Sequence, residues 1–291
     1  MTHRVSSAAL LGFAVACSAA LAAPDIHEGH DHSHGSVRHD EPRHRPHGAG
    51  DHAGHAHPGV DLSHPIVIES PLPETKLRVN YSFSDGGDES AHVAEIEAEY
   101  AFTQNFSIEA VLPYVFLNPD DGASENGLGD SIIAFKFASY AWIDQRVLPA
   151  VGFEVILPTA DEEKGLGSDH VVELEPFFRI GYWSGPFEFI GSVSVGIPLN
   201  QTDEESEEED FALGYGVSVL YHAAPSLQAL VEFHGESVYG AEDVHAFYIS
   251  PGATFQPFAD KSINVGVGAT LPVTDDRDFD YAINVMSIFH F

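Results

Sequence analysis

The stretch EIEAEYAF, residues 95–102, decides the fold because its polarity alternates with a period of two residues. In an extended strand, Glu95, Glu97 and Glu99 share one face. The other face carries Ile96, Ala98, Tyr100 and Phe102. A lipid-embedded β-barrel and a soluble β-sandwich both require such alternation. They differ in how strictly charge is sorted, because a charge at the bilayer midplane costs about 2–4 kcal/mol.

The same alternation recurs in twelve segments between residues 77 and 291. Each segment is roughly ten residues long, the length that a tilted strand needs to cross a bilayer. None of the predicted apolar faces contains a charge. The sequence therefore predicts an all-β, transmembrane, antiparallel up-and-down barrel of about 12 strands over residues 65–291. The last apolar face is predicted to comprise Phe279, Tyr281, Ile283, Val285, Phe289 and Phe291.

Charged side chains occupy the opposite faces and are predicted to point into the lumen. The predicted lumen residues are Glu95, Glu97, Glu99, Glu109, Asp130, Lys136, Glu154, Glu173, Glu175 and Arg179. Arg78, Lys136 and Arg179 are expected to pair with some of these glutamates. Such pairs could fill the lumen and leave no open pore.

The predicted connections alternate between short turns, as at 185–186, and longer acidic segments, as at 199–210. Outer-membrane barrels have short periplasmic turns and longer external loops. A final strand that ends in an aromatic residue, here Phe291, is typical of proteins that the barrel-assembly machinery recognises and inserts. Outer-membrane lipid and lipopolysaccharide are therefore expected partners. Pro176, Pro251 and the long connection 138–146 fit this scheme poorly, because proline lacks the N–H that a strand ladder needs.

The first residues are typical of a cleaved secretory signal. A weakly basic start precedes an apolar run from Ala8 to Ala16 and the cleavage pattern Ala20-Leu21-Ala22, so residues 1–22 are predicted to be a signal peptide. Cys17 leaves lipoprotein processing as the alternative. It is the only cysteine, which argues against disulfides, thiolate metal sites and cysteine nucleophiles in the mature chain.

Residues 23–64 are rich in histidine and almost free of large apolar side chains, so they are predicted to form a disordered periplasmic arm. Imidazole is a common ligand of Zn, Cu, Ni and Co, and closely spaced histidines in a flexible chain can share one exchangeable ion. The candidate ligands are His27, His30, His32, His34, His39, His44, His47, His52, His55 and His57. The alternative is a low-complexity linker without a metal role.

The charge balance and the remaining residue patterns exclude several classes of function. A formal net charge of -33 argues against nucleic acid as a partner, because such binding depends on Lys and Arg. No apolar stretch after the signal is long enough for a transmembrane helix. An outer-membrane hydrolase using His222, His234 or His245 is the competing class, but their spacing defines no triad.

Several segments resemble the family of outer-membrane transporters named for the meta-pathway of phenol degradation. The resemblance covers roughly residues 75–291. The matching segments are Gly127-Leu128-Gly129-Asp130, Leu157-Pro158-Thr159, Gly165-Leu166-Gly167-Ser168 and the strand and turn at 100–108 that lead to Leu112-Pro113-Tyr114. The resemblance implies a transport barrel but no particular substrate, and the histidine-rich arm is not part of it.

These patterns together predict a non-enzymatic outer-membrane channel, or transport-associated barrel, for small solutes. Cations and transition metals are the leading candidates, because acidic walls concentrate cations. The alternative is a closed barrel that anchors a metal-buffering arm. No cofactor is expected to be required, and periplasmic metal-handling proteins are candidate partners.

Overall fold

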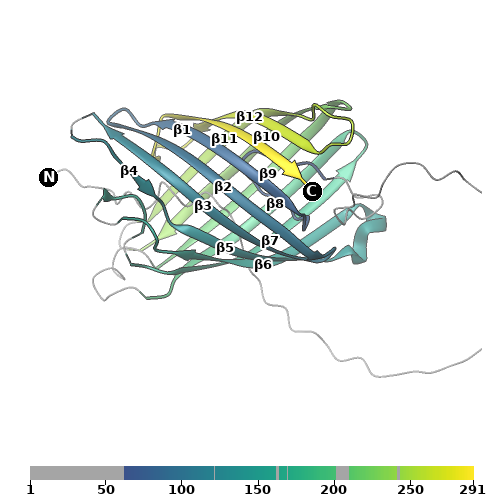
Figure 1. Cartoon of the computed structure of the whole chain (residues 1–291), viewed down its shortest axis with the longest axis horizontal. Coiled ribbons are helices and arrows are strands. Elements are labelled where there is room, and N and C mark those ends of the chain that lie inside the picture. Colours follow the sequence, from purple (N-terminus) through teal and green to yellow (C-terminus); the bar gives the residue numbers. More distant parts are fainter. Residues whose placement is uncertain (1–61, 121, 162–163, 169, 201–209, 241–242) are drawn as a thin grey trace, which may run out of the picture.

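The chain forms one antiparallel sheet that closes into a barrel (Figure 1). The computed structural model describes residues 62–291 apart from 121, 162–163, 169, 201–209 and 241–242. The elements are β1 (Lys76–Asp85), β2 (Glu89–Thr103), β3 (Phe106–Pro119), β4 (Glu125–Leu128), β5 (Ser131–Ala138), η2 (Tyr140–Gln145), β6 (Val147–Leu157), β7 (Glu173–Ser184), β8 (Phe187–Pro198), β9 (Phe211–Ala224), β10 (Leu227–Tyr239), β11 (Val244–Phe255), β12 (Ile263–Pro272) and β13 (Tyr281–His290).

The sheet closes because β1 pairs with both β2 and β13. Strands β4 and β5 both pair with β3, at 114–117 and 106–111 respectively, so they act as one interrupted strand of the barrel. The thirteen strands therefore make a barrel of twelve, which confirms the predicted twelve-stranded antiparallel fold. Within the described part of the chain, no helix has the length and apolar character needed to span a membrane.

The two ends of the barrel differ in their connections. One end carries the two-residue turns 104–105, 185–186 and 225–226 together with η2 and the chain's final residues, and we call it the short-turn end. The opposite end carries the longer segments, including 158–172 and 199–210, and we call it the loop end. The long connection that fitted the sequence pattern poorly is explained by η2, whose Tyr140 and Ile143 pack on a buried cluster.

The outer surface is an apolar belt with aromatic side chains toward both ends. Ile96 and Val267 remain 53% and 54% exposed, as expected of side chains that face lipid. Near the short-turn end the rings of Phe187 and Tyr221 lie 5.1 Å apart, and at the loop end those of Phe211 and Tyr239 lie 4.6 Å apart. Interfacial aromatic girdles flanking an apolar band are characteristic of outer-membrane barrels.

The two flagged prolines interrupt the strand ladder as the sequence indicated, whereas one aromatic position differs from the sequence expectation. Pro176 and Pro251 lie inside continuous strands, and the β7–β8 and β11–β12 pairings are interrupted beside them. The placement of Phe279 on the lipid face was wrong, because it is only 8% exposed and its ring stacks on Tyr248 at 5.1 Å. It precedes β13, which begins at Tyr281, so the two-residue period does not govern it.

The apolar belt generates a stability prediction. Val267 lies near the middle of β12 on the outer face, so Val267→Lys should lower the free energy of unfolding by about 2–4 kcal/mol. Denaturant titration of the barrel folded into lipid vesicles measures this loss. Val273→Lys, in the exposed segment beyond β12, is the matched control and should change little. Equal effects of the two substitutions would contradict a lipid-facing belt.

Candidate functional site

The barrel interior is occupied by residues 62–75, which precede β1 and which we call the lumen segment. Most of its apolar side chains are buried, with Ile68 fully so and Val67 partly so. Ile66 and Ile68 pack against inward-facing residues of β8, β9, β10 and β13, which are Ile190, Leu220, Leu230, Met286 and Ile288. The segment therefore fills the lumen with side chains that do not belong to the strands.

Glycines in the barrel wall make room for the lumen segment. A Cβ atom at Gly216 would lie 2.7 Å from Ile68 Cδ1, and one at Gly252 would lie 2.6 Å from Ile66 Cδ1. A Cβ atom at Gly181 would likewise lie 2.6 Å from the Leu62 side chain. Separations this short require displacement, because protein interiors leave no slack of this size. The wall is therefore shaped to receive this segment.

The Glu232 carboxylate holds the middle of the lumen segment. It accepts hydrogen bonds from three consecutive backbone N–H groups: Ile66 at 3.1 Å, Val67 at 3.0 and 3.2 Å, and Ile68 at 2.8 Å. Glu232 lies on β10 and is fully buried. The bonds are charge-assisted, and such bonds are stronger than those between neutral groups. One side chain thus satisfies three amides that have no strand partner.

Arginines on two strands contact the same segment. Arg179 on β7 pairs with Glu69 of the lumen segment, and its second nitrogen lies 2.8 Å from Glu154 of β6. Arg78 on β1 donates a hydrogen bond of 2.6 Å to the Ile66 carbonyl and lies 3.7 Å from Glu97. The cations therefore connect the segment to the acidic wall on both sides.

A lysine network lies closer to the short-turn end. Glu99 lies 3.2 Å from Lys76 Nζ and 3.0 Å from Lys136 Nζ, while Lys76 also lies 2.7 Å from Glu97. Lys136 reaches the Leu72 carbonyl at 3.5 Å. These side chains are almost completely shielded from solvent. Buried charges persist only when paired, and this network supplies the pairs.

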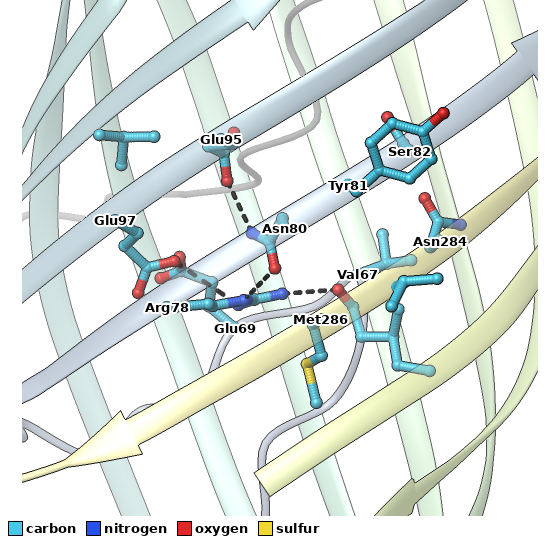
Figure 2. Close-up of a pocket in the computed structure, with 13 residues that line it drawn as sticks. Val67, Glu69, Arg78, Asn80, Tyr81, Ser82, Glu95, Glu97, Asn284 and Met286 are labelled. Carbon is cyan, nitrogen blue, oxygen red and sulfur yellow. Dashed lines mark hydrogen bonds and ion pairs between the residues drawn. The ribbon is translucent and has the colours of Figure 1, made fainter. Parts of the chain in front are cut away.

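A polar pocket adjoins the lumen segment, and Figure 2 shows its lining. Asn80 links its two walls: its amide nitrogen lies 2.7 Å from Glu95, and its oxygen accepts a bond of 2.8 Å from Arg78 Nε. Glu69 and Glu97 also border it. Three carboxylates and one guanidinium thus share the pocket, which gives it an acidic balance.

The structure gathers most of the predicted lumen residues around the lumen segment. Glu97, Glu99, Glu109, Lys136, Glu154, Glu175 and Arg179 are buried inside the barrel, and Glu95 borders the pocket. Asp130 is different, because it accepts hydrogen bonds from the backbones of Ala160 and Ser168 and so holds the 158–172 connection. Glu173 lies at the loop end of β7, beside Gly196.

The sequence did not predict that a segment outside the strands lies in the lumen. The alternation of Glu232 with Leu230 and His234 does place Glu232 on the inner face of its strand, but nothing in the sequence indicated that it binds residues 66–68. Glu69 carried no such signal, because it lies outside the strands. The candidate metal ligands His27 to His57 all fall in residues 1–61, outside the described part of the chain.

The three strand histidines form no triad. His234 Nε2 lies 2.8 Å from Ser250 Oγ, which in turn lies 2.8 Å from Thr270 Oγ1. Both His234 and Ser250 are buried in the wall, and the nearby Glu232 is engaged with the lumen segment. His222 pairs instead with Glu188. The arrangement is that of a polar ladder along the inner wall.

Comparison with known proteins gives one family and several similar folds. The family model described as "Putative MetA-pathway of phenol degradation" matches residues 73–285. No curated protein matches the sequence. An outer membrane channel from Pseudomonas putida F1 has a TM-score of 0.60 at 11% identity, covering 76% of this chain and 97% of the channel.

Two porins have the same fold. The NanC porin has a TM-score of 0.53 at 10% identity, covering 74% of this chain and 99% of the porin. The KdgM porin in complex with disordered oligogalacturonate has a TM-score of 0.51 at 7% identity, with coverage of 74% and 99%. The architecture is that of a porin-like outer-membrane β-barrel.

The Glu232 contact generates a prediction about local opening. Glu232→Gln replaces one acceptor oxygen by an N–H₂ donor that faces backbone donors, so the lumen segment should loosen. Because hydrogen bonds to charged groups contribute about 1.5–3 kcal/mol, amide exchange over residues 66–68 should accelerate roughly 10- to 100-fold. Hydrogen–deuterium exchange mass spectrometry measures it. Glu125→Gln in β4 is the matched control; equal exchange in both variants would refute the role of Glu232.

Proposed function

Because the chain belongs to the MetA-pathway of phenol degradation family, we propose that it is an outer-membrane channel for small solutes, closed in the described conformation by the lumen segment. Passage would require that residues 62–75 move away from the wall. The short-turn end would face the periplasm, as the alternation of short and long connections favours.

The observation that carries the proposal is how the lumen is filled. Small barrels are ordinarily filled by inward-facing side chains of their own strands. Here the wall also provides glycines, such as Gly216 and Gly252, and a segment without strand structure packs over them among the inward-facing side chains. Its polar anchors are hydrogen bonds and ion pairs to Glu232, Arg78 and Arg179, all of which are reversible.

The charge of the interior favours cations as the solutes. The buried cations of the described barrel strands are Lys76, Arg78, Lys136 and Arg179. The buried carboxylates of these strands are more numerous: Glu97, Glu99, Glu109, Glu154, Glu175, Glu188 and Glu232. A cleft lined by one sign of charge concentrates ions of the other sign. Movement of the lumen segment would remove Glu69 but leave the acidic wall in place.

The histidine-rich arm would serve the same barrel as a metal store. Residues 23–61 lead directly into the lumen segment, so ions held by His27 to His57 would be tethered to the pore. Exchangeable Zn, Cu, Ni or Co is the expected cargo. Periplasmic metal-handling proteins would be the partners that exchange these ions with the arm.

The extent to which the barrel interior is filled favours a second function, in which the barrel does not open. The segment, the ion pairs and the glycine contacts together occupy the interior, as expected of a permanently closed barrel that anchors a metal-buffering arm. The two functions differ in whether the lumen segment ever leaves the wall.

Conductance in a planar bilayer distinguishes them. Replacing residues 65–71 by a Gly-Ser sequence of equal length removes Ile66, Ile68 and Glu69 but keeps the barrel strands and the arm. The replaced variant should show frequent, cation-selective openings, whereas the mature wild-type chain should open rarely. The openings should occur because the lumen segment no longer fills the barrel, and they should favour cations because the acidic side chains of the wall remain.

The control is Glu125→Gln, which lies in β4 and should conduct like the wild type. A replaced variant that folds and does not conduct would sink the channel proposal and favour the anchor. Equal conductance of wild type and replaced variant would instead show that the lumen segment does not close the pore.

The proposed metal store has its own test. The test changes the ten arm histidines from His27 to His57 to asparagine. This change should abolish the weak binding of several zinc ions by the arm. Equilibrium dialysis with zinc at neutral pH gives the number of ions per chain. A variant that retains the wild-type number would contradict a metal role for the arm.

A further inference from the structure

Three potential metal ligands converge at the short-turn end of the barrel. His64 Nε2 lies 3.0 Å from Glu74 Oε2, and His290 Nδ1 lies 3.9 Å from Glu74 Oε1. The two imidazole rings lie 5.0 Å apart. One carboxylate therefore faces two imidazoles, and one ligand atom from each of the three residues lies within 4.8 Å of the other two.

We propose that His64, Glu74 and His290 form a binding site for a transition-metal dication, with zinc the simplest occupant. Two imidazole nitrogens and one carboxylate oxygen are a donor set that suits Zn, Cu and Ni, whereas Ca and Mg prefer all-oxygen sites. Three protein ligands would leave a fourth position for water. These residues are separate from the ten candidate ligands His27 to His57; His64 falls at the end of the predicted arm, but the structure buries it in the lumen segment.

The geometry needs only small movements to hold an ion. Nitrogen and oxygen ligands about 2.0–2.1 Å from zinc lie about 3.3 Å apart in a tetrahedron. The His64–Glu74 separation of 3.0 Å is already close to this value, and the 3.9 Å separation of His290 from the other Glu74 oxygen would have to shorten by about 0.6 Å.

The surroundings favour an ion over a simple salt bridge. His64 is only 5% exposed, so an ion held between its Nε2 and the Glu74 carboxylate would be shielded from solvent. The neighbouring cation Lys76 does not compete for the carboxylate, because it is paired with Glu97 and Glu99. The Glu74 carboxylate is therefore available to a cation, with two imidazole nitrogens beside it.

The position of the site gives it a mechanical role. His64 lies near the start of the lumen segment, Glu74 lies near its end, and His290 ends β13. A bound ion would clamp both ends of the lumen segment to the barrel wall. The three residues meet only in the folded chain, so binding here would stabilise the fold, unlike binding to the arm. This inference holds whether or not the barrel transports solute.

Zinc binding to the full mature chain, folded in detergent, tests the proposal. Competition with a chromophoric chelator counts the ions held tightly, and denaturant unfolding with and without zinc reports stabilisation of the fold. His290→Gln leaves every arm histidine intact, so it should lose one tightly held zinc per chain and most of the zinc-induced rise in the unfolding midpoint. His64→Gln should behave in the same way.

His245→Gln is the matched control, because His245 is an exposed strand histidine on β11 outside the cluster. It should keep both the wild-type zinc number and the wild-type midpoint rise. Retention of both by His290→Gln would overturn the proposal. Should either variant fail to fold, anomalous diffraction from wild-type crystals soaked in zinc provides the test. A peak between His64, Glu74 and His290 supports the site. The absence of that peak, at a zinc concentration that saturates the arm histidines, overturns it.

Discussion

Hydrocarbon offers no hydrogen-bond partner to a peptide group, and the structure depends on the closed ring of strand pairs that this constraint imposes. The seam between β1 and β13 completes the ring over ten residue pairs, from Lys76 with His290 to Asp85 with Tyr281. Closure sends alternate side chains inward, away from lipid. The apolar belt and the charged interior are therefore two results of the same pairing, and neither could change without the other.

The interior charges serve the backbone as much as they serve one another. The lumen segment has no strand partner, so its peptide groups need other partners in a space from which solvent is excluded. Glu232 accepts from three consecutive amides, while Arg78 and Lys136 donate to the carbonyls of Ile66 and Leu72. Acidic and basic side chains on the wall thus replace the neighbouring strand that this segment lacks. The same excess of acid that favours cations also holds the segment in place.

The sequence predicted the structure where polar and apolar residues alternate with a two-residue period, and it did not where that alternation is missing. Strand β2 could be predicted because its glutamates and apolar residues alternate, and the pairing partners require that alternation. The lumen segment could not be predicted, because its three prolines and irregular polarity follow no two-residue period. Glu69 was missed because it belongs to this segment. Inward-facing glycines such as Gly216 were the available signal, because a strand interior without side chains implies a close approach. Phe279 was misplaced by extending a period past the end of its strand.

The lumen segment is joined covalently to β1 at Lys76, so it can leave the wall without ever leaving the barrel's neighbourhood. Its return is an intramolecular event, governed by an effective concentration in the millimolar range for a short tether. Weak individual contacts are therefore enough for tight closure, and diluting the protein does not weaken it. A separate peptide of the same sequence would compete poorly at micromolar concentrations, because it pays the full entropic cost of association that the tethered segment avoids.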